Sequence, residues 1–591
     1  MSSRAFRKRS TRRSTFYPRL LGSRGAVATM HYLSASAARE VLGAGGNAID
    51  AAVAAVLVEG QVNPHMNTIG GECPIILKMA DSPRVHVING NTAAPGRANS
   101  DAYLRRGFSD VPEEGILAAG VPATPGSLLL ALERFGSMSF NEVTAPAIAF
   151  ARDGFPIHRG LLGQERFGIR DLAKKFRNFW PTSAALYLSN GEVPEEGTII
   201  KNPALASMLD YLANAERAAN GSRSSKIAAV RDAFYRGDVA REIAAFSQER
   251  DGLLDRNDLS VYQTFMEQST STKFGEAKLF KCGFWTQGPT VLQCLGILRN
   301  FDLNSMGHNS ADYLHTLIET IKLVFADREQ YYGDGFSIQV PEQELLSEEY
   351  AALRSALIDT DKVLGALLPG DPRAMLAEMP LEDTFGGREW GNGTVHVDVI
   401  DRKGNMVAAT PSGAWIKSSE VVANLGFPLG TRLMTFYLGP EHHPNAIAPH
   451  KRPRTTISPS LATFKQQPWM VFGSMGGDQQ DQWQLQFFLN CVVFKMTVQE
   501  AIEAPKLSSD HFPGFFAPHD RFPNKVRIEP RVSGRTIDNL RRRGHAVEIG
   551  ADWSEGYLLA AAIDPKRDVL EVGCDPRGWK GEIFPATAMC W

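Results

Sequence analysis

The N-terminal part of the chain shows a helical pattern of apolar positions followed by a strand pattern. Small and apolar side chains recur at helical spacing over Ser34–Leu42 and again over Ala48–Val62. Asn47 directly precedes the second segment and is a favourable N-cap. Two short segments rich in aliphatic residues, Pro74–Met79 and Arg84–Ile88, are then predicted to be paired strands.

The pattern changes twice further along the chain. Residues 100–380 are mostly helical in pattern, and Pro369–Gly393, with its Pro, Gly and acidic residues, is typical of an exposed linker. Alternation then predicts a strand over Thr394–Asp401. Arg402–Asn405, which contains a glycine, is predicted to be a hairpin turn leading into a return strand over Met406–Thr410. Further strands are expected at Leu461–Phe464 and Trp469–Phe472, and helices at Gln482–Val493 and Val498–Ala504. Strands in both halves, with helices around them, predict an α/β sandwich shared across the linker.

Composition and charge narrow the class of protein. The 591 residues are 43% hydrophobic and 22% charged, which is ordinary for a globular protein, and the net charge is −2. This charge gives no general attraction to nucleic acid or membrane, and no apolar run approaches the ~18 residues of a membrane span. Residues 1–24 are a basic tail that contains no acid.

The cysteines and the tail bear on location. The six cysteines are scattered and form no C-x-x-C pair, so neither a disulfide framework nor a zinc site is expected. A cytoplasmic location fits best, while the Arg/Ser-rich start leaves mitochondrial import or export open.

Thr394 carries unusual chemical potential if the chain is cut before it. Cleavage between Gly393 and Thr394 would give the threonine a free α-amine of pKa ~7.7–8.0 beside its own hydroxyl. That combination of base and nucleophile on one residue is the N-terminal threonine solution to amide hydrolysis.

Two glycines and a serine are candidates for the same site. Gly476 and Gly477 follow a predicted strand and precede a helix, where backbone N–H groups can form an oxyanion hole supplying ~2.7–4 kcal/mol per donor. Ser412 ends the hairpin partner of the Thr394 strand and can tune the amine and assist cleavage. Taken singly, both segments also fit ordinary turns.

Thr455 and Thr456 place two hydroxyls just before another predicted strand. They are candidates for binding a substrate carboxylate or the Thr394 amine, although a Thr-Thr pair is also common within strands.

Taken together, these segments resemble the gamma-glutamyltranspeptidase family of N-terminal nucleophile hydrolases. The matching pieces run in the family's order from about residue 24 to the C-terminus: Gly25–Thr29, Gly45–Val53, Ile69–Gly71, Val121–Gly126, Ala151–Phe155, Thr394–Asn405, Lys451–Pro459, Gly473–Gly477 and Asp575–Arg577. Each piece is weak alone, but the set is specific.

The resemblance implies a precursor that cuts itself before Thr394. The large subunit would be residues 25–393 after the basic tail, and the small subunit residues 394–591, folded together as a four-layer αββα sandwich. Thr394 would be the nucleophile, Ser412 its supporting hydroxyl, and Gly476 and Gly477 the oxyanion hole. The resemblance implies a small-molecule amide substrate and no metal or organic cofactor, and it leaves open a dimer of heterodimers.

The sequence departs from the family at the expected glutamyl anchors. Asn91 replaces an arginine that pairs with the α-carboxylate, and Thr435 replaces an aspartate that pairs with the α-ammonium. Loss of a charged partner in a desolvated site costs ~2–5 kcal/mol of binding. Thr455 and Thr456 stand where the family has two serines that hold the substrate carboxylate. Arg432 replaces an uncharged polar residue, and is either a clamp for a small carboxylate or a surface arginine.

Three functions follow as hypotheses. The first is an N-terminal threonine amidohydrolase acting on a gamma-glutamyl compound such as glutathione, by hydrolysis or transfer. The second is the same enzyme acting on a small amide acid such as oxamate. The missing anchors favour this second substrate, whereas the frequency of gamma-glutamyl substrates in the family favours the first. The alternative from another class is an uncleaved, non-catalytic protein that binds a small carboxylate. A Ser-His-Asp hydrolase is set aside because the chain has no G-x-S-x-G motif.

Overall fold

Two seven-stranded sheets form the centre of the molecule. The computed structural model describes residues 14–163, 168–379, 393–564, 567–580 and 584–591. In spatial order, one sheet holds β1 (Leu20–Gly22), β20 (Val569–Cys574), β19 (Leu558–Asp564), β15 (Gln467–Ser474), β14 (Ser460–Phe464), β9 (Ala277–Lys281) and β8 (Thr270–Phe274). The other holds β21 (Thr587–Cys590), β2 (Gly25–Thr29), β10 (Val397–Asp401), β11 (Met406–Ala409), β3 (Ile75–Lys78), β4 (Val85–Asn89) and β7 (Phe265–Gln268).

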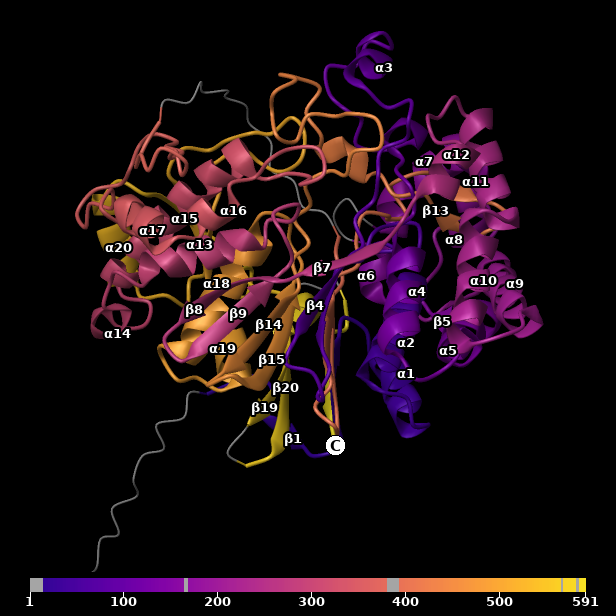
Figure 1. The fold of residues 1–591 in the computed structure, drawn as a ribbon, viewed down its shortest axis with the longest axis horizontal. Helices are drawn as coiled ribbons and strands as arrows, with labels where there is room; N and C mark the ends of the chain where they lie inside the picture. The colour runs from indigo at the N-terminus through magenta and orange to yellow at the C-terminus, as the bar shows by residue number, and fades with distance from the viewer. Residues whose placement is uncertain (1–13, 164–167, 380–392, 565–566, 581–583) are drawn as a thin grey trace, which may run out of the picture.

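The sheets pack face to face, and a layer of helices covers the outer face of each (Figure 1). The core between the sheets mixes side chains from both, such as Ala28 and Met406 from one and Val471 and Ala561 from the other. On one side lie α1 (Tyr32–Gly43), α2 (Ala48–Val62), α4 (Thr124–Phe135), α5 (Phe140–Asp153), α9 (Pro203–Ala218) and α10 (Arg223–Tyr235). On the other lie α13 (Pro289–Leu298), α15 (Ala311–Tyr331), α17 (Glu348–Ser355), α18 (Gln479–Val492) and α19 (Val498–Glu503). The predicted four-layer αββα sandwich is confirmed.

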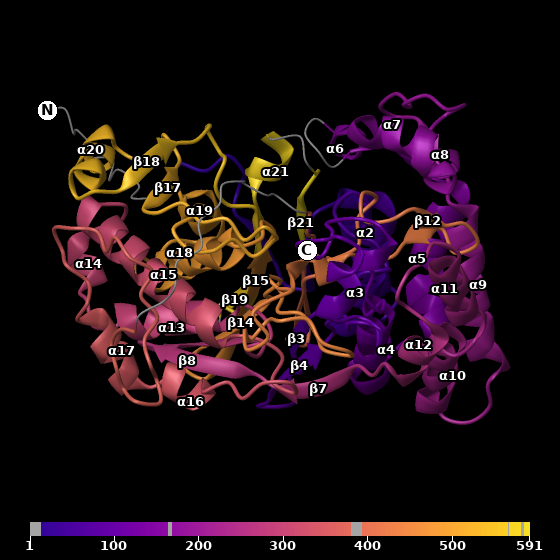
Figure 2. The same ribbon diagram turned by 90° about the horizontal axis from the view of Figure 1, so that it is seen from above.

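Shorter elements complete the fold, and the view from above keeps the two helical layers apart (Figure 2). The remaining helices are α3 (Ser100–Leu104), α6 (Arg159–Leu162), α7 (Ile169–Phe179), α8 (Pro181–Tyr187), α11 (Asp238–Glu249), α12 (Arg256–Val261), α14 (Leu303–Met306), α16 (Glu342–Leu345), α20 (Gly534–Arg542) and α21 (Pro576–Lys580). The small strands are β5 (Phe155–Pro156), β6 (Ile199–Ile200), β12 (Val421–Val422), β13 (Phe427–Pro428), β16 (Leu507–Ser509), β17 (Lys525–Ile528) and β18 (Ala546–Ile549). No helix in these described ranges has the length and hydropathy needed to span a bilayer.

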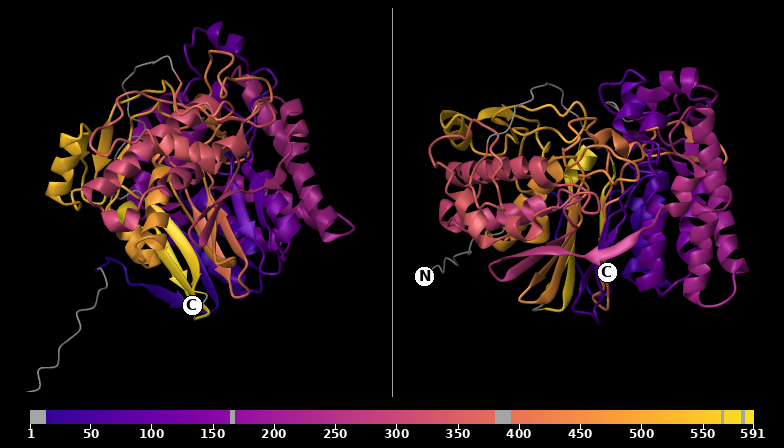
Figure 3. Two further views of the ribbon diagram at one scale, coloured as in Figure 1. Left: turned by 60° about the vertical axis from the view of Figure 1, so that its left-hand side comes forward. Right: turned by 45° about the horizontal axis from the view of Figure 1, so that its top comes forward.

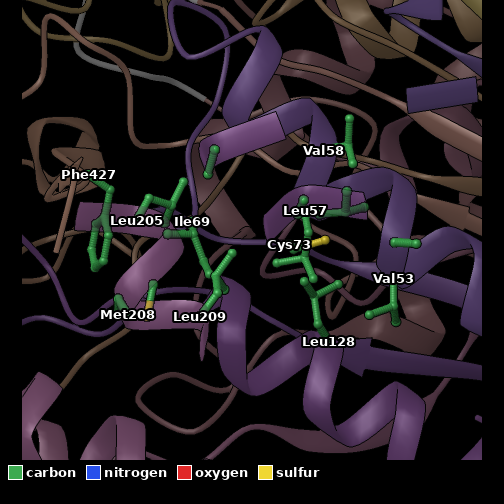
Figure 4. Close-up of a cluster of buried hydrophobic side chains, with 14 of the residues drawn as sticks. Val53, Leu57, Val58, Ile69, Cys73, Leu128, Leu205, Met208, Leu209 and Phe427 are labelled. Atoms are coloured by element: carbon green, nitrogen blue, oxygen red, sulfur yellow. The ribbon is translucent and has the colours of Figure 1, made fainter. Parts of the chain in front are cut away.

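The helix α2 is the centre of the larger core. Asn47 caps it by accepting hydrogen bonds from the backbone N–H groups of Ile49 and Asp50, as the sequence predicts. Its Val53 and Leu57 pack toward Leu128 of α4, and Leu205 of α9 lies beside Ile69 and Phe427 in the same cluster (Figure 4). Burying each large aliphatic side chain stabilises the fold by ~1.5–3 kcal/mol.

The prediction that residues 100–380 are mostly helical is confirmed, since α3 to α17 lie there. The region also contains β7, β8 and β9, which were not predicted and carry the chain from one sheet to the other (Figure 3). Most side chains of β7 and β8 are only half-buried, so these two strands lack the strong alternation of a core strand. The strand predicted to begin at Thr394 begins at Val397, because Pro411 has no N–H with which to extend the ladder. The segment 380–392 of the predicted linker and residues 1–13 of the tail lie outside the described residues.

Candidate active site

Thr394 and Ser412 lie opposite each other just beyond the open end of the β10–β11 hairpin. Thr394 and Ser412 form an isolated antiparallel bridge, and the N–H of Val395 donates to the carbonyl of Pro411 at 3.2 Å. The Thr394 hydroxyl lies 3.0 Å from the Ser412 hydroxyl, and both side chains are buried. The predicted proximity of these two residues is thus present in the structure.

Ser412 is a hub of hydrogen bonds. Besides its contact with Thr394, its Oγ donates to the carbonyl of Gly393 at 3.0 Å and accepts from Nη2 of Arg432 at 2.9 Å. The indole Nε1–H of Trp415 also donates to the Gly393 carbonyl, at 2.6 Å. The peptide group between Gly393 and Thr394 therefore lies in a dense set of polar contacts.

Arg432 is buried rather than on the surface, which excludes one of the two expectations for it. Its side chain has 2% relative exposure, and its Nε donates to Oε1 of Glu72 at 2.5 Å. Glu72 is fully buried and exchanges two backbone hydrogen bonds with Ser412, both 2.9 Å. Sequence reasoning missed Glu72, although this acid directly follows the Ile69–Gly71 motif.

Thr455 and Thr456 take different positions. The Thr455 hydroxyl donates to Oε1 of Glu72 at 2.9 Å, so Thr455 belongs to the Arg432–Glu72 group. The Thr456 hydroxyl instead accepts from the side-chain amide of Gln480 on α18 at 3.5 Å, a long contact. Only Thr455 is therefore tied directly to Glu72.

Asn91 and Thr435 supply no charge to the site. The Asn91 amide donates to the carbonyl of Pro453 at 2.6 Å, and the Thr435 hydroxyl donates to the carbonyl of Arg432 at 2.8 Å. Both side chains are fully buried and hold backbone segments in place. At these two positions the resemblance predicts charged anchors in related enzymes. Here both positions hold uncharged side chains that hydrogen-bond to backbone carbonyls.

Gly476 and Gly477 form the turn between β15 and α18. Both have positive φ, +116° and +57°, and a Cβ on Gly476 would lie 2.5 Å from the ring of Trp483. The side-chain amide of Gln287 donates to the carbonyl of Gly477 at 3.0 Å. Phe516, which packs in one cluster with Trp415, is the nearest neighbour of a Cβ on Gly477, at 3.4 Å. The turn is therefore built around glycine and lies next to the aromatic cluster that borders the Thr394 junction.

A buried ion network supports this turn from behind. Arg328 pairs with Asp478, the residue after the glycines, and also donates to Gln287 Oε1 at 3.0 Å. Burial alone would raise the pKa of Glu329, but the neighbouring Arg454 and Arg328 outweigh it and lower that pKa to about 2. Glu329 therefore stays ionised at neutral pH, and the Arg328–Asp478 pair holds the chain directly after the two glycines.

His396 is a further buried polar residue near Thr394 that the sequence analysis did not single out. Its Nδ1 lies 2.8 Å from the Thr410 hydroxyl, and its Nε2 lies 3.0 Å from Asp398. All three side chains are fully buried. Burial raises the pKa of Asp398, and His396 partly offsets this. The alternation of His396 and Asp398 on one strand face was the available signal.

In the part of the chain that the structure describes, one group brings three potential metal ligands close together. His315, Glu319 and His545 have ligand atoms within 4.8 Å of one another. His315 Nδ1 and His545 Nε2 already share a 2.8 Å hydrogen bond, and Lys322 contacts both Glu319 oxygens at 3.0 and 3.2 Å. Glu319 is thus paired with Lys322 and the two histidines with each other, while the buried Nδ1 of His545 has no hydrogen-bond partner within the described ranges.

The two face-to-face sheets and their covering helical layers are the architecture of the N-terminal nucleophile hydrolases. The family model for gamma-glutamyltranspeptidase matches residues 34–584, so the chain belongs to that family and is an enzyme of its hydrolase and transferase class.

Known relatives match along nearly the whole chain. A "Glutathione hydrolase-like YwrD proenzyme" of Bacillus subtilis (strain 168) is 28% identical over 567 residues, 95% of this chain and 98% of its own. An "Acylase ACY 1 proenzyme" of Pseudomonas sp. (strain SE83) is 28% identical over 584 residues, 96% of this chain and 94% of its own.

Solved structures share the whole architecture. The structure of LmbA2991HD has a TM-score of 0.90 and 38% identity, covering 98% of this chain and 100% of that one. The cephalosporin acylase from Bacillus halodurans has a TM-score of 0.82 and 26% identity, covering 99% of both chains. The expectation of an enzyme in this family is confirmed, and the non-catalytic alternative is disfavoured.

Proposed function

We propose that the chain cuts itself between Gly393 and Thr394 and then hydrolyses an amide through an acyl-Thr394 intermediate. The contact that carries the proposal is the 3.0 Å approach of the Thr394 and Ser412 hydroxyls beside the Gly393 carbonyl. A free Thr394 amine would take the hydroxyl proton as the oxygen attacks the amide carbon. The leaving amine departs with a proton, and water then hydrolyses the ester.

Gly476 and Gly477 are the proposed oxyanion donors for substrate turnover. Both glycines have positive φ, and at Gly476 only glycine adopts this backbone conformation without strain. The Arg328–Asp478 ion pair holds the turn in place. Preorganised donors of this kind need no rearrangement as charge develops.

The proposed substrate is a small amide acid, such as oxamate, rather than a gamma-glutamyl compound. Asn91 and Thr435 provide no charge for a zwitterionic glutamyl group, and both hydrogen-bond to backbone carbonyls. Arg432 is the proposed clamp for a carboxylate on this substrate. Among the described residues, Glu72 and Ser412 take two of its five N–H groups, leaving others for a substrate.

Gamma-glutamyl chemistry is the second candidate, because a relative at 28% identity is named glutathione hydrolase-like. The relatives named as acylases support a broader choice of acyl group within the same architecture. A cytoplasmic location and a dimer of heterodimers complete the proposal, and six free cysteine thiols fit the former.

A substrate panel on the purified protein tests the acyl group. Oxamate, glutathione and a gamma-glutamyl anilide are compared with wild type and with Thr394→Ala as the blank. The proposal expects kcat/KM for oxamate to exceed that for both gamma-glutamyl compounds. A preference for glutathione would transfer the assignment to gamma-glutamyl hydrolysis, while turnover by Thr394→Ala would remove Thr394 as the nucleophile.

A further inference from the structure

The carbonyl of Gly393 receives two hydrogen bonds from side chains that are fully buried. Trp415 donates from Nε1 at 2.6 Å, and Ser412 donates from Oγ at 3.0 Å. Two donors converging on one carbonyl oxygen are the arrangement that stabilises a negative charge developing there. This carbonyl belongs to the peptide bond that the proposed function requires to be cut.

Trp415 is held rigidly in its donating position. Its backbone N–H donates to the Ser418 hydroxyl at 3.0 Å, and the next N–H, of Ile416, donates to the carbonyl of Pro64 at 3.0 Å. The indole packs with Met434, Phe515 and Phe516, and the guanidinium carbon of Arg432 lies 5.4 Å from the ring centroid. A donor fixed in this way needs little reorganisation when negative charge develops on the carbonyl oxygen.

Gly393 is small enough to let its carbonyl reach the indole. A Cβ at this position would lie 2.8 Å from Cα of Met66, 2.9 Å from the carbonyl oxygen of His65 and 3.1 Å from Cδ1 of Trp415. Any larger residue would therefore push the scissile peptide group away from Trp415.

The hydrogen-bond inventory around Ser412 fixes the direction of the Thr394 hydroxyl. Arg432 Nη2 donates to Ser412 Oγ, and the single Ser412 hydrogen points to the Gly393 carbonyl. The contact between the two hydroxyls must then use the Thr394 hydrogen, with Ser412 as acceptor. Ser412 is thus placed to receive the proton that Thr394 loses when it attacks.

We propose that Trp415 is a catalytic residue of the self-cleavage step, with its indole N–H forming an oxyanion hole at Gly393. The inference rests on the proposed cut before Thr394. The Thr394 oxygen forms a bond to the Gly393 carbonyl carbon, and the carbonyl oxygen carries the negative charge between Trp415 and Ser412. The C–N bond then breaks, and the proton from the Thr394 hydroxyl reaches the Thr394 nitrogen through Ser412.

The resulting ester between Gly393 and Thr394 is an isomer of the original chain. One water molecule hydrolyses it to a Gly393 carboxyl group and a free Thr394 hydroxyl beside its new amine. The self-cleavage step therefore uses donors on Trp415 and Ser412, whereas Gly476 and Gly477 are the donors proposed for external substrates.

The test follows precursor conversion in a pulse-labelled cell-free synthesis of the full chain. The sharpest variant replaces Trp415 by benzothienylalanine, which keeps the bicyclic shape but has sulfur in place of N–H. We expect self-cleavage about 10²–10³-fold slower than wild type, the effect of losing one oxyanion donor. Trp415→Phe should be slowed at least as much, and Trp469→Phe, whose ring packs near Phe464 and Phe488, is the matched tryptophan control with wild-type conversion.

The outcomes separate this inference from the proposed function. Wild-type cleavage rates in the benzothienylalanine variant would overturn the role of Trp415 and leave the cut before Thr394 intact. A wild-type chain that stays whole would overturn the proposed cleavage itself. If Trp415→Phe fails to fold, as shown by loss of its thermal transition, the isosteric variant still decides the question.

Discussion

Glu72 and Arg432 form a buried ion pair between residues 360 positions apart, with Nε and Oε1 separated by 2.5 Å. The pair joins the two chains that the proposed cleavage would produce. It also links the Ser412 hydroxyl, through Arg432, and the Thr455 hydroxyl, through Glu72, into one group. The position of the supporting hydroxyl therefore depends on residues from both sides of the cut.

Breaking this pair from one side should be more harmful than removing it entirely. Arg432→Met leaves the Glu72 carboxylate buried without its partner, which typically costs about 3–5 kcal/mol. The double variant Glu72→Gln with Arg432→Met should recover part of that loss. Urea unfolding of the two single variants and the double variant gives the coupling energy. Strictly additive losses would show that the pair does not act as a unit.

Substitutions of the two turn glycines should differ in severity. Gly476→Ala places a Cβ 2.5 Å from the Trp483 ring at φ +116°, so the turn must distort. We expect kcat to fall about 10²–10³-fold, as when one oxyanion donor is lost. Gly477→Ala, at φ +57° with its nearest neighbour at 3.4 Å, is the milder matched control. Steady-state kinetics on processed enzyme measures both, and equal losses would argue against this geometry.

The buried Glu59 predicts a specific pH dependence of stability. Burial raises the pKa of this carboxyl to about 8, while hydrogen bonds such as that from Asn63 oppose the shift only in part. Because the folded-state pKa exceeds the unfolded value of about 4.3, the stabilising effect of the protonated form is complete below that value. It is lost progressively as the pH rises to about 8.

Glu59→Gln should remove this pH dependence. The melting temperature of the variant relative to wild type should therefore rise by several degrees between about pH 4.5 and about pH 8.5. Differential scanning fluorimetry across this range measures the difference directly, with wild type as the reference at each pH. A difference that is constant with pH would place the Glu59 pKa near its ordinary value.

Local chemistry explains which parts of the fold could be predicted from the sequence. The capped helix Ala48–Val62 could be predicted closely, because Asn47 and the apolar face are signals within the segment itself. The strand at β7 was missed, because its half-buried side chains carry little alternation and its pairing with β4 spans the sequence from Val85 to Gln268.

In the site too, contacts between residues close in sequence could be predicted, whereas long-range contacts could not. Thr394 and Ser412 lie on one hairpin, so their proximity follows from a short turn. Glu72 and Trp415 could not be assigned, because the former contacts an arginine 360 positions away and the latter acts through an indole N–H that no spacing rule reveals. Arg432 was left open between clamp and surface, and only its burial decided between them.

The break before Thr394 is the most direct test of the whole account. Intact-mass spectrometry of the purified active protein should find two chains, one of residues 394–591 with Thr394 at its amino terminus. Thr394→Ala should give a single full-length mass and no amidase activity. Active wild-type protein with an unbroken Gly393–Thr394 bond, or two fragments from Thr394→Ala, would contradict the account.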